Sequence, residues 1–103
     1  MNFYIGIGEK RFISKNSVRI DNEYFNQNVF NILDENLVIF DKLDPYGKCI
    51  LYSDDIVKLR SDCELILKND IIKDKQVVKK IKILEYMCDF ALTEGVHIIY
   101  CGD

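Results

Sequence analysis

The sequence predicts a small α+β domain whose single sheet includes both terminal strands and packs against two long helices. Apolar, β-rich runs lie near both ends of the chain, and two stretches in its second half carry apolar residues at helical spacing. With 103 residues, of which 49% are hydrophobic, the chain has the length of one domain and enough apolar surface to form a core. We therefore expect one domain over residues 1–103.

Short β-like runs occupy the N-terminal part of the chain. The apolar residues near the start predict a strand over 2–7. Two shorter pieces, 11–14 and 17–20, flank an expected turn at Lys15 and Asn16. We expect the first strand to lie in the same sheet as the last strand of the chain.

A less regular segment follows. Helical spacing of apolar residues predicts a helix within 21–34, with Asp21 or Asn22 as its N-cap. The asparagines of this stretch are poor helix formers, so the composition disfavours the helix that the apolar spacing predicts. The continuous apolar run 37–40 predicts a short buried strand.

The middle of the chain contains its clearest turn signal. The lone proline and the glycine two residues after it predict a turn at 44–47. Residues 49–52 are expected to be extended or to form a loop. Ser53 is the expected N-cap of a helix over 54–68, which carries one apolar stripe.

The second half of the chain completes the predicted fold. A polar hinge at 69–74 precedes a second helix over about 74–93, which should end at Gly95. The β-branched run 96–101 predicts the final strand. The apolar stripes of both helices should meet the sheet, which buries Leu59, Ile66, Ile81, Leu84 and Cys88.

The N-terminus and the cysteines indicate the compartment. No basic segment followed by an apolar one opens the chain, and no run reaches the roughly 18 apolar residues of a membrane span. We therefore expect a cytoplasmic protein that makes no membrane contact and keeps its thiols reduced. These thiols should pack as small hydrophobic groups. The four cysteines are Cys49, Cys63, Cys88 and Cys101.

The sequence offers no catalytic, cofactor-binding or metal-binding constellation. Gly6-Ile7-Gly8 is a fragment of a nucleotide-binding loop, but Arg11 stands where the third glycine is required. His97 is the only histidine and lies in a predicted strand, which favours a structural role over catalysis. No two cysteines have the C-x-x-C spacing of a zinc site. We expect no cofactor, no metal and no enzymatic activity.

Charge is unevenly distributed along the chain, whose formal net charge is −3. From Asp21 to Asp55 there are eight acidic and two basic residues, whereas from Lys68 to Lys82 there are six basic and two acidic residues. The acidic balance argues against direct nucleic-acid binding. We expect the lysine cluster at 79–82 to be a solvated helix face, because no arginine or aromatic residue accompanies it.

Tyrosines among the carboxylates predict a docking surface for a basic partner, since tyrosine supplies rigid contact area with a polar tip. A position in the first turn after Ser53 already explains Asp54 and Asp55, so the remaining residues are the stronger candidates. The full set of candidate partner-binding residues is Asp41, Asp44, Tyr46, Tyr52, Asp54 and Asp55.

Three stretches of the chain suggest a family. They are the opening segment 2–8 with Glu9, the middle segment 43–47 with 51–59, and the end of the long helix with 96–103. A loop with Asp-Pro, a helix, a second long helix and a short last strand follow one another in this order. In this order, and in its size and acidity, the chain resembles the small immunity proteins of bacterial polymorphic-toxin and contact-dependent growth-inhibition systems.

The resemblance implies tight, neutralising binding to the C-terminal domain of a cognate toxin, usually a nuclease. Two other functions stay open at this point. A small regulatory or accessory binding protein would have the same composition, and a small enzyme would need Asp54 and Asp55 to face a pocket. We expect the free protein to be a monomer or a weak dimer.

Overall fold

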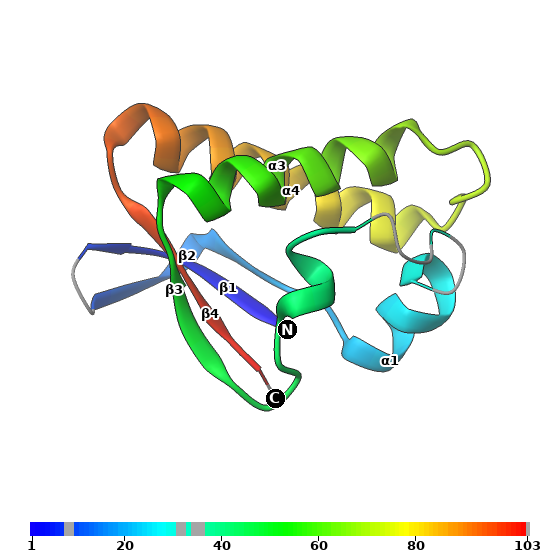
Figure 1. The fold of residues 1–103 in the computed structure, drawn as a ribbon, viewed down its shortest axis with the longest axis horizontal. Helices are drawn as coiled ribbons and strands as arrows, with labels where there is room; N and C mark the ends of the chain where they lie inside the picture. Colours follow the sequence, from blue (N-terminus) through cyan, green and yellow to red (C-terminus); the bar gives the residue numbers. More distant parts are fainter. Residues whose placement is uncertain (8–9, 31–32, 34–36, 103) are drawn as a thin grey trace.

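The first and last strands of the chain lie side by side in the centre of one four-stranded antiparallel sheet (Figure 1). The computed structural model describes residues 1–7, 10–30, 33 and 37–102. The strands are β1 (Asn2–Ile7), β2 (Lys10–Arg19), β3 (Lys48–Leu51) and β4 (His97–Cys101), in the order β2-β1-β4-β3. The α+β prediction is confirmed, including the place of both terminal strands in one sheet.

The expected turn within 11–20 is wrong. Residues 11–19 belong to the single strand β2, which pairs with β1 in an interrupted register. Tyr4 lies opposite Ser17, but the next residue, Ile5, lies opposite Phe12. Four residues of β2 therefore have no counterpart in β1 and form an irregularity inside the strand.

The predicted helix within 21–34 begins where expected but is regular for only one turn. Asp21 is the N-cap of α1 (Asn22–Phe25), and its side chain accepts a hydrogen bond from the N–H of Tyr24 at 2.9 Å. A π-helical turn, η1 (Asn26–Phe30), follows. The side chain of Asn28 donates to the carbonyl of Tyr24 at 2.8 Å, so it competes for an acceptor that a regular helix would use. Most of 31–36 lies outside the described residues.

The predicted strand at 37–40 is wrong, although most of its residues are buried. The chain bends here and then forms the short 3-10 turn η3 (Phe40–Lys42). The backbone N–H groups of Val38, Ile39 and Phe40 donate to the carboxylate of Asp62. Because one side chain satisfies these three donors, the segment is held in place without a partner strand.

The two long helices cover one face of the sheet (Figure 1). They are α3 (Ser53–Lys68) and α4 (Lys75–Glu94), which is capped by Asp74 and ends at Gly95 with φ of 68°. The expected N-cap Ser53 is wrong, because β3 extends to Leu51 and leaves only Tyr52 between strand and helix. Tyr52 is the N-cap and makes no side-chain capping bond.

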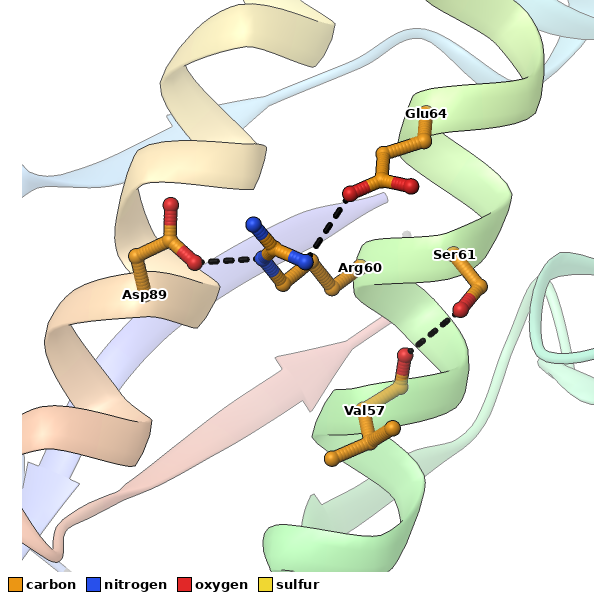
Figure 2. Close-up of polar contacts among 5 residues, drawn as sticks. All are labelled: Val57, Arg60, Ser61, Glu64 and Asp89. Carbon is orange, nitrogen blue, oxygen red and sulfur yellow. Dashed lines mark hydrogen bonds and ion pairs between the residues drawn. The ribbon is translucent and has the colours of Figure 1, made fainter.

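The core lies between the helix pair and the sheet. All five predicted core residues are buried with at most 1% of their surface exposed: Leu59, Ile66, Ile81, Leu84 and Cys88. The sheet contributes alternate residues from its central strands, such as Phe3 and Tyr100. On the outer side of the helices, Arg60 of α3 forms an ion pair with Asp89 of α4 and, within α3, a second one with Glu64 at 2.9 Å (Figure 2).

Candidate functional site

The outer edge of β3 has no strand partner among the described residues. The N–H of Gly102 donates to the carbonyl of Gly47 at 2.6 Å, which marks a hydrogen-bonded pair of the antiparallel ladder. Such pairs alternate along the ladder, so Lys48 and Ile50 direct their N–H and C=O groups away from β4. The sheet therefore ends in a short edge whose backbone groups have no ladder partner in the described part of the chain.

A rigid turn lies at one end of this edge. Tyr46 is 86% exposed at its tip. The side-chain carboxylate of Asp44 accepts a hydrogen bond from the N–H of Tyr46 at 2.9 Å. The backbone carbonyl of Asp44 accepts a second one from the N–H of Gly47 at 3.1 Å. The hydroxyl of Tyr100 donates to the same carbonyl at 2.7 Å, which fastens the turn to β4. These bonds confirm the predicted turn at 44–47, hold its backbone and leave the side chain of Tyr46 in solvent.

Close packing adds to the rigidity of this turn. A Cβ atom on Gly102 would collide with the backbone of Pro45, so only glycine lets the last strand pass so close to the turn. Asp41 is exposed on the segment before the turn and, with Pro45, lines a small cavity of about 230 Å³. Asp41, Asp44 and Tyr46 thus belong to one segment that leads into β3.

A second group of predicted residues lies at the opposite end of β3. Tyr52 is 61% exposed, and its ring packs against that of His97 with centroids 5.6 Å apart. Asp54 is exposed and Asp55 half-buried in the first turn of α3, where carboxylates interact favourably with the helix dipole. Partial burial, and next the charge of Asp55, raises the pKa of the nearby Cys49 thiol.

The six predicted residues therefore do not form one cluster. They form two groups at opposite ends of β3, whose four residues alone span roughly 13 Å at the usual rise of a strand. We call the strip that runs from the turn, along β3, to the first turn of α3 the β3 edge. It is defined by Asp41, Asp44, Tyr46, Lys48, Ile50, Tyr52, Asp54 and Asp55.

We next consider the residues that a catalytic or metal-binding function would use. His97 and Ser53 line a shallow cavity of about 270 Å³ beside Tyr52. Within the described ranges, no three His, Cys, Asp or Glu side chains come close enough together to hold a metal ion. Gly8 of the glycine fragment lies outside the described residues. No helix among the described residues has the length and apolar character needed to cross a bilayer.

Sequence reasoning missed the residue that positions the segment before the turn. Asp62 is only 2% exposed, and its two oxygens accept from three consecutive N–H groups at 2.7 to 3.1 Å. Its position is a recognisable signal, because an aspartate stands among the buried residues of α3, three residues after Leu59 and four before Ile66. A carboxylate on a core stripe must be paired, which predicts a backbone or cationic partner.

Comparisons of the chain with protein-family models, with curated proteins and with solved structures found no significant match.

Proposed function

We propose that the chain is a stoichiometric inhibitor that binds the basic catalytic domain of a cognate toxin, most simply a nuclease, and occludes its active site. The observation that carries the proposal is the β3 edge, where two exposed tyrosines stand at opposite ends of one strand, each with carboxylates nearby. The resemblance to small immunity proteins supports the same proposed function. In this proposal the chain acts in the cytoplasm and has no catalytic role of its own.

The carboxylates of the β3 edge should accelerate association with a basic partner. A nuclease cleft that holds nucleic acid is lined by cationic groups, and carboxylates at the rim of an inhibitor accelerate association with such a cleft. Asp41, Asp44 and Asp54 are exposed, so their charges act through solvent and are screened by salt. They should therefore govern the rate of association more than the lifetime of the complex.

The tyrosines of the β3 edge should instead slow dissociation of the complex. Tyr46 presents most of its surface on a turn that is already ordered, so burying it in a partner costs little conformational entropy. Aromatic side chains of this kind are frequent hot spots of protein interfaces. Tyr46, and secondarily Tyr52, should govern the lifetime of the complex.

Side chains rather than strand addition carry recognition in this proposal. The outer edge of β3 is only four residues long and bears Lys48, and short edges with a lysine disfavour pairing with an arbitrary strand. Lys48 also adds a positive charge that a basic partner would have to avoid. The partner is thus expected to contact both ends of the β3 edge.

Co-purification tests the proposal most simply. The chain is co-expressed with the protein encoded by the neighbouring gene, which in this proposal encodes the C-terminal end of a large secreted toxin. The expected result is a 1:1 complex in which the nuclease activity of the partner is lost, and a free chain that sedimentation shows to be a monomer or weak dimer. An accessory binding protein would form a complex that leaves the partner active, and the absence of any complex would contradict both functions.

A further inference from the structure

We propose that a lysine-rimmed groove at the start of α4 docks an acidic, amphipathic helix of a partner protein. The groove has a volume of about 450 Å³. We call it the lysine groove and define it by the residues that line it: Ile72, Lys73, Lys75, Val78, Lys79 and Lys82. The β3 edge has no part in it.

The rim of the groove carries a regular array of positive charge. Lys75, Lys79 and Lys82 follow i, i+4, i+7 spacing on α4, so they share one face and span roughly 10 Å along the helix axis. Lys73 joins them from the preceding hinge. None of these four lysines makes an ion pair within the part of the chain that the structure describes.

Among the described acidic residues, Asp70 and Asp74 lie in the hinge beside the groove and offset only part of the charge of its four lysines. The first turn of α4 contains no acidic residue, although it is the positive end of the helix dipole. The carboxylate of Asp74 is engaged as the N-cap, where it accepts from Val77 at 3.0 Å, and it also accepts from the hydroxyl of Tyr24. The rim therefore keeps an excess of positive charge among the described residues, and an anionic partner would be attracted to it.

The apolar floor of the groove favours an anionic partner that also carries apolar side chains. Ile72 is buried and Val78 half-buried, so the floor is apolar. A bare phosphate would gain nothing from such a floor, whereas a helix with carboxylates beside an apolar stripe would use both rim and floor.

Nucleic acid fits these observations less well. The described residues that line the groove include no arginine and no aromatic residue, so they offer neither bidentate phosphate contacts nor base stacking. The chain as a whole carries a net charge of −3, which repels a long polyanion. The spacing of the lysines instead matches the i, i+4, i+7 spacing of carboxylates along one face of a helix.

The position of the groove makes this inference independent of the proposed function. Figure 1 shows α4 beginning at the end of the helix pair opposite to the one where β3 enters α3. A partner in the lysine groove and a partner on the β3 edge could thus be bound together. Failure of one interaction would leave the other untouched.

Fluorescence anisotropy with a labelled synthetic helix tests the inference. The probe is a peptide of glutamate, leucine and alanine with glutamates on one side of the leucine stripe; a second peptide has glutamine in place of glutamate, and a third has the same composition in scrambled order. The triple variant Lys75→Gln, Lys79→Gln, Lys82→Gln is compared with Lys42→Gln, Lys48→Gln, Lys58→Gln, which removes the same charge from exposed lysines elsewhere.

The expected result is saturable, salt-sensitive binding of the amphipathic acidic peptide that weakens by about tenfold or more in the groove variant and by less than about twofold in the control. Both variants change exposed side chains and should keep the circular dichroism spectrum of the wild-type protein. Equal weakening in the two triple variants would overturn the inference. It would also be overturned if the scrambled peptide, inorganic polyphosphate or a short DNA duplex bound as tightly as the amphipathic one.

Discussion

The carboxylate of Asp62 accepts a hydrogen bond from the backbone N–H of Ile39 at 2.7 Å, although 23 residues separate the two in the chain. The same carboxylate accepts from Val38 at 2.9 Å and from Phe40 at 3.1 Å. Asp62 belongs to α3, whereas Val38 to Phe40 lead into the segment that carries Asp41. One buried side chain thereby fixes the backbone that enters the β3 edge to the helical layer.

Loss of this carboxylate should destabilise the protein severely. Asp62→Ala would leave three N–H groups without their acceptor, two of them in buried bonds, and should lower the free energy of unfolding by about 3 kcal/mol or more. Urea denaturation followed by circular dichroism measures this change. Asp70→Ala, at an exposed position in the hinge, is the control and should change it by less than about 0.5 kcal/mol. A loss below about 1 kcal/mol in Asp62→Ala would show that these bonds do not hold the segment.

The helix–sheet core gives a second stability prediction. Leu84 has no exposed surface, so Leu84→Ala should create a cavity and cost about 2–5 kcal/mol of unfolding free energy. Ile83, the preceding residue, is an exposed hydrophobic residue of the same helix. Ile83 is 36% exposed, so Ile83→Ala should cost clearly less than Leu84→Ala in the same denaturation experiment. Similar losses in both variants would mean that the buried face of α4 is assigned wrongly.

The four thiols should separate into two classes. Burial raises the pKa of Cys63, and it raises the pKa of Cys88 to about 12, so both should stay unreactive in the folded protein. Cys49 and Cys101 reach the surface and should react with a thiol reagent in the native state. Spectrophotometric titration should find all four thiols free after unfolding under non-oxidising conditions. Fewer than four would refute the expectation that they are reduced.

The contact between Tyr24 and Asp74 should make part of the stability depend on pH. The hydrogen bond from Tyr24, and next that from the N–H of Val77, holds the pKa of Asp74 below its ordinary 3.8. A carboxyl with a lowered folded-state pKa contributes stability above its ordinary value, and this contribution is lost as the pH falls through the folded-state value. The same bond raises the pKa of Tyr24 above 10.0, so the phenol's contribution is lost as the pH rises through its raised value.

The variant Tyr24→Phe removes the hydrogen bond from the Tyr24 hydroxyl and keeps the one from the N–H of Val77. The pKa of Asp74 should rise towards its ordinary value but stay below it, because the N–H of Val77 still donates. Carboxyl chemical shifts recorded by NMR during an acid titration measure this change directly. An Asp74 titration that is the same in the variant and the wild-type protein would contradict the assigned hydrogen bond.

Local patterns were sufficient to predict most of the fold. Helical spacing located α3 and α4, and a glycine at the end of α4 adopts the positive φ expected of a helix C-terminus. The β-rich runs at the two ends of the chain located β1 and β4. These features depend on residues close together in the sequence, which is why they can be read without a structure.

Features that depend on distant residues were not predictable in this way. The apolar run 37–40 is not a strand because Asp62, far along the chain, supplies its hydrogen-bond acceptors. The irregularity of β2 is visible only in its pairing with β1. Tyr46 and Tyr52 are exposed, but the strand that stands between them is defined only by the pairing of β3 with β4.

Within the proposed complex, the two kinds of residue on the β3 edge should affect different rate constants. Asp41→Ala should slow association, with an effect that fades at high salt, whereas Asp44→Ala should also speed dissociation because it removes the side-chain acceptor of the Tyr46 N–H. Tyr46→Ala should speed dissociation, at a cost of about 2 kcal/mol or more in binding free energy. Surface plasmon resonance at two salt concentrations separates the two rates. An effect of Tyr46→Ala confined to association would contradict its role as an anchor.

The affinity of the toxin domain for one triple variant tests the central claim most directly. Asp41→Ala, Asp44→Ala, Tyr46→Ala changes two carboxylates and one exposed tyrosine of the β3 edge, and the matched control Asp70→Ala, Glu94→Ala, Tyr86→Ala makes the same kinds of change elsewhere on the surface. Isothermal titration calorimetry should show binding weakened by roughly 30-fold or more in the first variant and by less than about threefold in the control. Undiminished binding of the first variant would contradict the claim that the toxin is held by the β3 edge.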